Sequence, residues 1–411
     1  MKRVLRLLLL GGMLGAFVFG TRFLIIGNTF EVRSEKGDEG AAEKNDRTEK
    51  IVKRIPKETP RQLPLENPPK IIRAIYLTAW SAGNPATIDN VIVRVKDSEI
   101  NAVVIDIKDH TGVLSYRADI EEVNRMNAWE SRIKDVNGVI KKLHDAGIYV
   151  IARITVFQDP MLTVWRPDLA IHDTRKISSS TPISSSTIWL DNHKAGWLDP
   201  AARPAWEYVA AIAKDASSRG FDELNFDYIR FPSDAGLQYT HFLSWDENTR
   251  RETAIRNFFS YLRQELPNVV ISADVFGQTT VTYTSDMGIG QVLEDAYDYF
   301  DVTSPMLYPS HYVKNFLGLD NAAARPYEVV KFSMEHALKR LRNTATSTRE
   351  RAKIRPWLQD FDLGGVPYTP EMVRAQIEAT KDAMGASYAG YYLWDPSNTY
   401  TWSALKRESL Q

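Results

Sequence analysis

Short apolar, β-branched runs alternate with longer amphipathic windows from about residue 71 to the end of the chain. Short buried runs are typical of parallel strands, and apolar positions with helical spacing are typical of helices that cover a sheet. The predicted strands span residues 71–80, 102–108, 148–156, 223–230, 269–276, 302–308, 354–361 and 389–394. The predicted helices span residues 86–99, 136–146, 204–219, 247–265, 289–297, 326–343 and 370–384, with a short closing helix after the last strand.

Eight strand–helix units in about 340 residues predict a single α/β domain, a closed parallel (β/α)₈ or TIM barrel. The competing architecture is an open doubly wound sheet, but the G-x-G-x-x-G motif that often follows its first strand is missing. The longest insertion, residues 157–203, follows the third strand and contains two serine triplets, at 178–180 and 184–186. Its length and composition predict a surface lid or flexible flap that borders the cleft.

The N-terminus carries the pattern of an export signal. Lys2, Arg3 and Arg6 precede an apolar run over residues 7–20, as in the charged and hydrophobic regions of a signal peptide. The apolar character continues far enough to cross a bilayer, with the basic residues on the cytoplasmic side. Residues 1–30 are therefore expected to be either a cleaved signal peptide or a retained transmembrane anchor.

A charged segment that becomes proline-rich, residues 31–70, follows the apolar run and has little periodic apolar pattern. This composition predicts a disordered linker. The folded domain is expected over residues 71–411. It would lie outside the cytoplasmic membrane in the cell envelope, either anchored to the membrane or secreted.

Composition excludes several classes of function. The 51 basic and 52 acidic residues nearly balance, so nucleic acid is not an expected partner. The chain has no cysteine, which excludes disulfides, thiolate metal sites and a cysteine nucleophile. The seven histidines form no H-E-x-x-H or other close pair, and neither a P-loop nor a G-x-S-x-G motif is present. We therefore expect no metal and no cofactor.

Polar and aromatic side chains gather where the predicted strands end. The C-terminal ends of the strands of a closed parallel barrel face one common crater, where the chemistry of such barrels is found. The residues at these ends are Trp80, Asp106, Lys108, Arg153, Asp227, Tyr228, Arg230, Asp274, Tyr308, Gln359, Asp360, Trp394 and Asp395. Alternate residues of a strand share a face, so Asp106 can point into the same space as Lys108.

Paired carboxylates surrounded by aromatic rings are typical of sites that cleave glycosidic bonds. One acid protonates the leaving oxygen while the other attacks, activates water or stabilises the oxocarbenium-like centre, and sugar rings stack on Trp and Tyr. A strand-end aspartate is also often a helix cap or an ion-pair partner, an interpretation that stays open for Asp106, Asp360 and Asp395. Asp227 differs because it lies in an otherwise apolar strand, where an unneeded charge would be costly.

These considerations predict Asp227 and Asp274 as the catalytic residues. The expected substrate-binding residues are Trp80, Asp106, Lys108, Arg153, Tyr228, Arg230, Tyr308, Gln359, Asp360 and Trp394. The three basic residues among them could instead compensate the carboxylates, which is also how a site keeps one of its acids ionised.

The stretch GFDELNFDYIRFPSD, residues 220–234, resembles the bacterial "putative glycosyl hydrolase domain" family, a barrel family similar to other glycoside hydrolase-like barrels. The supporting stretches are RAIYLT at 73–78, VIDIKD at 104–109, YVIARI at 149–154, WLDP at 197–200 and GYYLW at 390–394. Together they cover nearly all of the predicted domain.

The resemblance implies a barrel with a carbohydrate-related role. The strand-four carboxylate of related α-glycosidase-like barrels falls on Asp227, as nucleophile or stabiliser. Many such relatives carry a glutamate on the fifth strand, whereas this chain has Asp274 and so departs from the pattern.

The sequence therefore predicts a glycoside hydrolase that acts on a cell-envelope or extracellular polysaccharide. The alternative is a catalytically inactive carbohydrate-binding barrel that organises wall or capsule polymer.

Overall fold

The computed structural model describes residues 59–344 and 352–406 of the 411-residue chain. The predicted export segment and the linker as far as residue 58 lie outside the described residues. Within the described ranges, no helix is both long enough and apolar enough to cross a membrane.

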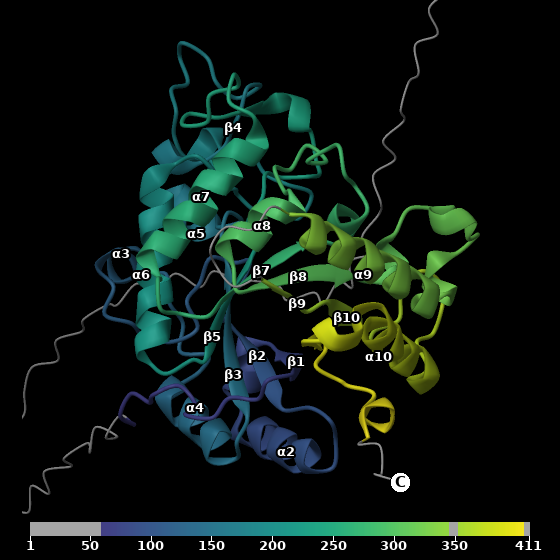
Figure 1. Cartoon of the computed structure of the whole chain (residues 1–411). Coiled ribbons are helices and arrows are strands. Elements are labelled where there is room, and N and C mark those ends of the chain that lie inside the picture. The colour runs from purple at the N-terminus through teal and green to yellow at the C-terminus, as the bar shows by residue number, and fades with distance from the viewer. Residues whose placement is uncertain (1–58, 345–351, 407–411) are drawn as a thin grey trace, which may run out of the picture. The chain divides into compact units, whose positions relative to one another are not determined.

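A ring of parallel strands forms the centre of the domain (Figure 1). The ring runs β1-β2-β3-β5-β7-β8-β10-β11 and closes where β11 pairs with β1, so the sheet is a barrel and not an open doubly wound sheet. The barrel strands are β1 (Ile72–Leu77), β2 (Ala102–Lys108), β3 (Tyr149–Thr155), β5 (Glu223–Asp227), β7 (Ile271–Phe276), β8 (Val302–Leu307), β9 (Lys353–Ile354), β10 (Trp357–Gln359) and β11 (Gly390–Trp394). The TIM-barrel fold predicted from the alternating pattern is confirmed.

Helices follow most of the strands and cover the outside of the barrel (Figure 1). They are α1 (Ala79–Ala82), α2 (Pro85–Lys96), α3 (Glu121–Met126), α4 (Val136–Asp145), α5 (Pro160–Trp165), α6 (Arg203–Ser218), α7 (Arg251–Glu265), α8 (Leu293–Tyr299), α9 (Pro326–Asn343) and α10 (Pro370–Met384). Several begin with proline in the first turn, where its missing N–H is not needed. The predicted closing helix is a short 3₁₀ turn, Trp402–Leu405.

Three strands end or break where the sequence did not predict it, each for a local reason. β5 stops at Asp227, not at Arg230, because Tyr228 has a positive φ of 55° and turns the chain. β1 stops at Leu77 because Thr78 accepts a hydrogen bond from the Ser81 N–H and caps α1. The seventh strand is split into β9 and β10 around Pro356, which cannot donate to the sheet.

Apolar side chains fill two layers. One lies between the barrel and its helices, and the other fills the barrel interior with residues such as Ala74, Val104 and Ile151. Toward the N-terminal ends of the strands, the interior also contains a buried ion pair, because Arg355 Nη1 lies 2.9 Å from Glu223 Oε2. The Tyr392 hydroxyl donates to the other oxygen of Glu223 at 2.5 Å, so the pair is hydrogen-bonded as a buried charge requires.

Residues 59–70, assigned above to the linker, pack against the N-terminal ends of the strands. Leu65 contacts the apolar cluster of the barrel interior, and its N–H donates to Asp222 Oδ1 at 2.6 Å. The Gln62 N–H donates to the Arg219 carbonyl at 3.1 Å. The folded domain therefore includes residues before Ile71. Both the backbone and the side chains of this segment contact the rest of the domain, although its composition is that of a linker.

The insertion after β3 contains α5 and a two-residue strand, β4 (His172–Asp173), that pairs antiparallel with β6 (Thr240–His241). Trp189 and Trp197 are buried within it, whereas most residues of the two serine triplets are exposed. The insertion thus combines a packed base with an exposed serine-rich part.

Candidate active site

Arg153 lies at the centre of a cluster of carboxylates in the upper barrel interior. It projects from β3, and its Nη1 donates to Asp106 Oδ1 of β2 at 2.6 Å. Its Nη2 donates to Asp227 Oδ2 at the end of β5, and its Nε lies 3.9 Å from Asp274 Oδ2 of β7. The structure thus brings these four predicted residues together, because their positions on neighbouring parallel strands point into the same interior.

Asp274 is almost completely buried, and both donors that hold it bind the same oxygen. The indole Nε1 of Trp357 donates to Asp274 Oδ1 at 2.7 Å, and Asn225 Nδ2 donates to the same oxygen at 2.8 Å. Burial raises the pKa of Asp274 well above its usual value, and the nearby charge of Asp227 raises this pKa further, while Arg153 opposes both effects. Oδ1 thus accepts both hydrogen bonds, whereas Oδ2 is the oxygen nearer Arg153.

Asp106 is also buried and is held from two sides. The Tyr76 hydroxyl donates to Asp106 Oδ2 at 2.5 Å, opposite the Arg153 contact on Oδ1. Burial raises the pKa of Asp106, while the Arg153 charge and the Tyr76 hydrogen bond lower it. Asp106 therefore orients Arg153, and the positive charge of Arg153 is paired with both Asp106 and Asp227.

Aromatic rings line the space next to these charges. Trp394 stacks on Tyr76 with ring centroids 4.0 Å apart, and the Arg153 guanidinium lies 5.2 Å from the Trp394 ring. Tyr308 packs against Phe361 at 5.7 Å. Burial raises the pKa of the Tyr308 hydroxyl, and the charges of Asp274 and Asp227 raise it further. The predicted aromatics Tyr308 and Trp394 thus lie beside the carboxylates.

The chain turns sharply after Asp227 and places a second group of aromatic residues at the mouth. The positive φ of Tyr228 lets its own N–H donate to Asp227 Oδ1 at 2.6 Å. Its ring lies 5.8 Å from that of Trp197, so the base of the insertion reaches the mouth of the barrel. Arg230 lies among Trp197, Tyr228 and Phe276, with its guanidinium carbon 4.6–5.3 Å from the three ring centroids. A non-glycine residue in this backbone region is typical of functional sites.

Two predicted binding residues lie away from the Arg153 cluster. Trp80 belongs to α1 and not to a strand; it is 60% exposed, and Arg132 lies 5.4 Å from its ring. Lys108 is fully buried, because its Nζ lies 2.9 Å from Asp159 Oδ2 and donates to the Thr155 carbonyl at 2.7 Å. Trp80 therefore lies exposed on the surface. Lys108 links β2 and β3 to the start of the insertion.

The predicted residues at the last two strands hold loops. Gln359 accepts from the Ser310 hydroxyl at 2.8 Å and donates to the Phe361 carbonyl at 2.8 Å. Asp360 accepts from the hydroxyl of Thr401 at 2.7 Å and from its N–H at 2.9 Å. Asp395 accepts from the N–H and hydroxyl of the serine two residues later. Asp360 and Asp395 thus fit the interpretation as structural partners that stayed open above.

Five residues that shape the site were not among the predicted site residues: Tyr76, Asn225, Trp197, Phe276 and Trp357. Asn225 carried a signal, since it is a polar residue two positions before Asp227 in an apolar strand and shares its face. Trp357 carried none, because a tryptophan in an apolar run is consistent with any core position.

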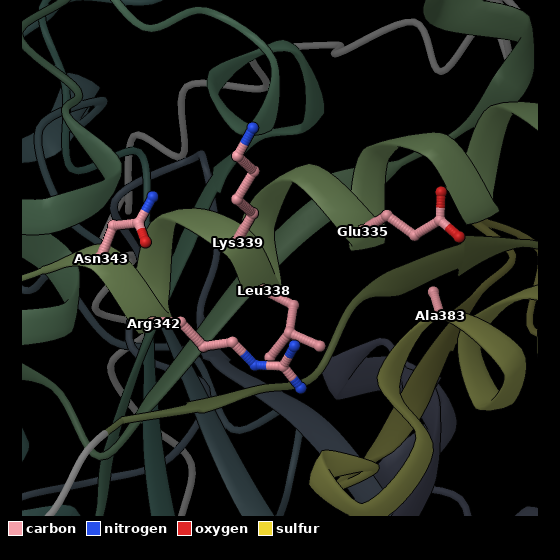
Figure 2. A pocket seen from close by; sticks show the side chains of 6 residues that line it. All are labelled: Glu335, Leu338, Lys339, Arg342, Asn343 and Ala383. Carbon is pink, nitrogen blue, oxygen red and sulfur yellow. The ribbon is translucent and has the colours of Figure 1, made fainter.

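Among the described residues, no group of three or more His, Asp or Glu side chains could hold a metal ion. A surface hollow of about 250 Å³ lies between α9 and α10 (Figure 2). Its lining residues are Glu335, Leu338, Lys339, Arg342, Asn343 and Ala383. It belongs to the outer helix layer and contains none of the predicted site residues.

A closed (β/α)₈ barrel with paired carboxylates and aromatic rings at the C-terminal ends of its strands has the architecture of many glycoside hydrolases. Residues 74–400 match the model of the "putative glycosyl hydrolase domain" family, and the chain belongs to this family. The resemblance inferred from the FDYIRFP region is thereby confirmed. No curated protein matches the sequence.

Two of the solved structures that are similar to this chain, with TM-scores above 0.5, share the fold. The glycoside hydrolase domain of PgaB (BpsB) from Bordetella bronchiseptica is 15% identical, with 82% of this chain and all of that chain covered and a TM-score of 0.53. Alpha-L-fucosidase isoenzyme 2 from Paenibacillus thiaminolyticus is 12% identical, with coverages of 81% and 47% and a TM-score of 0.51. A hypothetical protein from Ruminiclostridium thermocellum is 37% identical, with coverages of 49% and 97% and a TM-score of 0.43.

Proposed function

We propose that this protein hydrolyses O-glycosidic bonds in a polysaccharide, with Asp227 as nucleophile or base and Asp274 as general acid. The observation that carries the proposal is the pair of carboxylates beside Arg153. Asp227 is ion-paired with the guanidinium, whereas the pKa of Asp274 is raised by burial and by the charge of Asp227. Two carboxylates whose environments differ in this way are the arrangement that acid-assisted glycoside cleavage requires.

Each part of the arrangement has a chemical role in this mechanism. The Asp274 proton passes to the glycosidic oxygen as the bond to the leaving group breaks, and Asp227 attacks or directs water at the positive centre. The new Asp274 carboxylate keeps the donors Trp357 and Asn225 and lies next to the Arg153 charge. The interior therefore stabilises the anion that forms during the reaction.

We further propose that the substrate is a cell-envelope or extracellular polymer. The basic residues and apolar run at the N-terminus support delivery across the cytoplasmic membrane. Family membership supports a carbohydrate as the substrate.

The test is hydrolysis of a panel of bacterial polysaccharides by the full-length protein and three variants. Asp227→Asn and Asp274→Asn should each lower kcat/KM by roughly 10²-fold or more, because each removes a charge or proton needed in the transition state. Asp227→Asn should still bind the substrate. Asp395→Asn, in the turn after β11, is the matched control and should keep its activity.

The inactive-barrel alternative gives a different outcome. A wild-type protein that binds a polysaccharide without cleaving any member of the panel would support that alternative. Cleavage that survives both active-site substitutions would show that the reaction occurs elsewhere.

A further inference from the structure

Within residues 59–344 and 352–406, Arg230 is a buried cation without a carboxylate partner. Six lysine and arginine side chains are buried among the described residues: Lys108, Arg153, Arg219, Arg230, Arg340 and Arg355. Every one of them except Arg230 has a carboxylate within ion-pair distance. Removing a charge from water without a counter-charge is costly, so an exception at the mouth of a candidate active site calls for an explanation.

The contacts of Arg230 hold one part of its guanidinium and leave the rest unpaired. Nη1 donates to the Phe231 carbonyl at 3.1 Å and to the Ser233 hydroxyl at 3.2 Å. Within the described part of the chain, Nε and Nη2 have no hydrogen-bond partner, and neither is among the buried unsatisfied atoms. The guanidinium is therefore fixed in place, with one donor edge reaching the solvent.

The rings around Arg230 favour a cation and also restrict how it can move. Its guanidinium carbon lies 4.8 Å from the Trp197 ring, 5.3 Å from the Tyr228 ring and 4.6 Å from the Phe276 ring. Such contacts stabilise a positive charge but provide no hydrogen-bond acceptor. A planar donor edge that is held rigidly next to aromatic rings matches the geometry of an oxyanion.

The position of Arg230 connects it with the proposed reaction. It follows Asp227 by three residues, and the Tyr228 ring that it contacts belongs to the residue next to Asp227. Burial lowers the pKa of Arg230, while the charges of Tyr228, Asp227, Asp234 and Asp191 oppose this effect from a longer range. These carboxylates lie too far away to pair with Arg230.

We propose that Arg230 binds an oxyanion carried by a sugar next to the cleaved bond, so that the substrate is an acidic polysaccharide. That the bound acidic polysaccharide is a substrate rests on the proposed function, whereas the anion-binding site itself does not. A uronic-acid carboxylate fits the donor edge in a bidentate manner, and a sugar phosphate presents the same chemistry. The Trp197, Tyr228 and Phe276 rings would pack against the sugar that carries the charge.

The experiment measures binding by calorimetry to full-length protein carrying Asp227→Asn, which blocks turnover. The probes are oligogalacturonates, hyaluronan oligosaccharides, the carboxyl-reduced neutral form of each, and the pair glucuronate and glucose 6-phosphate. An acidic probe should bind about tenfold or more tightly than its neutral form. Arg230→Gln should remove this preference. The monosaccharide pair distinguishes a carboxylate from a phosphate.

Arg251→Gln is the matched control. Arg251 also stacks on two rings, Phe231 and Trp245, and donates to the Gly288 carbonyl at 2.7 Å, but it is only half-buried. Its substitution should leave the preference for acidic probes unchanged. If Arg230 only braces the loop, Arg230→Gln lowers the melting temperature and the preference for acidic probes survives, which overturns the proposal.

The remaining outcomes separate this inference from the proposed function. Failure of every acidic probe to bind more tightly than its neutral form overturns the inference. Cleavage of a neutral polysaccharide at a rate that Arg230→Gln does not change leaves the hydrolase and removes the anion site. Binding that depends on Arg230, in a protein that cleaves no polysaccharide of the panel, leaves the anion site and removes the hydrolase.

Discussion

At the scale of single residues, the two donors on Asp274 Oδ1 give Trp357 a role beyond packing. A hydrogen bond to a carboxyl oxygen favours the ionised form, so the indole lowers the pKa of Asp274 against the effect of burial. Trp357→Phe removes this donor and should raise the pKa of the acid. The alkaline limb of the pH profile of kcat/KM should therefore move to higher pH.

Trp206→Phe is the control for this prediction. Its indole also donates one hydrogen bond within the protein, to the Pro200 carbonyl at 2.8 Å, but it lies in the outer apolar layer. It should lose similar packing without moving the alkaline limb. A Trp357→Phe enzyme whose activity falls while the limb stays in place would show that Trp357 only fills space.

The raised pKa of Asp274 also predicts how stability depends on pH. The unfolded chain loses this proton near the ordinary aspartate pKa, while the folded protein keeps it to higher pH. The contribution of Asp274 to the free energy of unfolding is therefore fully present below the unfolded pKa and is lost as pH rises through the folded pKa. Asp274→Asn should gain stability relative to wild type over that window, by at most about 1.4 kcal/mol per pH unit. Urea denaturation at a series of pH values measures this, and a constant difference between the two proteins would contradict it.

Individual site residues could be predicted only where a polar residue interrupts an apolar strand. Asp227 and Asp106 could be found because they are carboxylates within apolar strands, and Arg153 because it is the one charged residue of its strand. The separate environments of Asp227 and Asp274 could not be predicted. They depend on burial, on the charge of Asp227 and on contacts such as that of Trp357 on β10, which is separated from the strand of Asp274 by β8.

At the scale of elements, residues 59–70 act as part of the barrel although their composition is that of a linker. Leu65→Ala should lower the free energy of unfolding of the full-length protein by about 1 kcal/mol, because Leu65 is only half-buried against the interior cluster. Leu63→Ala is the matched control, since Leu63 is 85% exposed and should have no effect. Denaturant titration of both variants checks this, and equal stabilities would show that the segment adds nothing to the fold.

The composition of the insertion did not reveal which of its residues reach the mouth of the barrel. The serine triplets led to the prediction of a flap. The residue of the insertion that reaches the mouth of the barrel is instead the buried Trp197, which follows the triplets in the sequence. Asp191 organises this part by accepting from the indole of Trp197 at 2.8 Å and from the Gln158 amide at 2.6 Å. The contacts of Gln158 with Asp191 and of Trp197 with Tyr228 join residues far apart in sequence, so neither periodicity nor composition could reveal them.

At the scale of the whole molecule, the barrel was predictable because each of its repeats has the same pattern. Parallel strands covered on both sides are apolar over most of their length, and the runs at 102–105 and 149–152 show this directly. The ends of strands were less predictable, since Tyr228 and Pro356 break two of them through local backbone geometry. These breaks matter, because the first one places Arg230 at the mouth.

The remaining prediction concerns where the molecule is located. Lys2, Arg3 and Arg6 precede an apolar run without charge over residues 7–20, and the barrel follows this run in the sequence. A basic flank stays in the cytoplasm, so the barrel should be transferred to the outer side. A chain with no cysteine needs no disulfide to fold there. A fluorescent reporter that folds only in the cytoplasm, fused to the C-terminus, should stay dark. Replacing Leu8, Leu9 and Leu10 with aspartate should make it bright, because three charges prevent the run from entering the membrane. A bright fusion of the unchanged chain would place the barrel in the cytoplasm and would rule out an envelope polymer as its substrate.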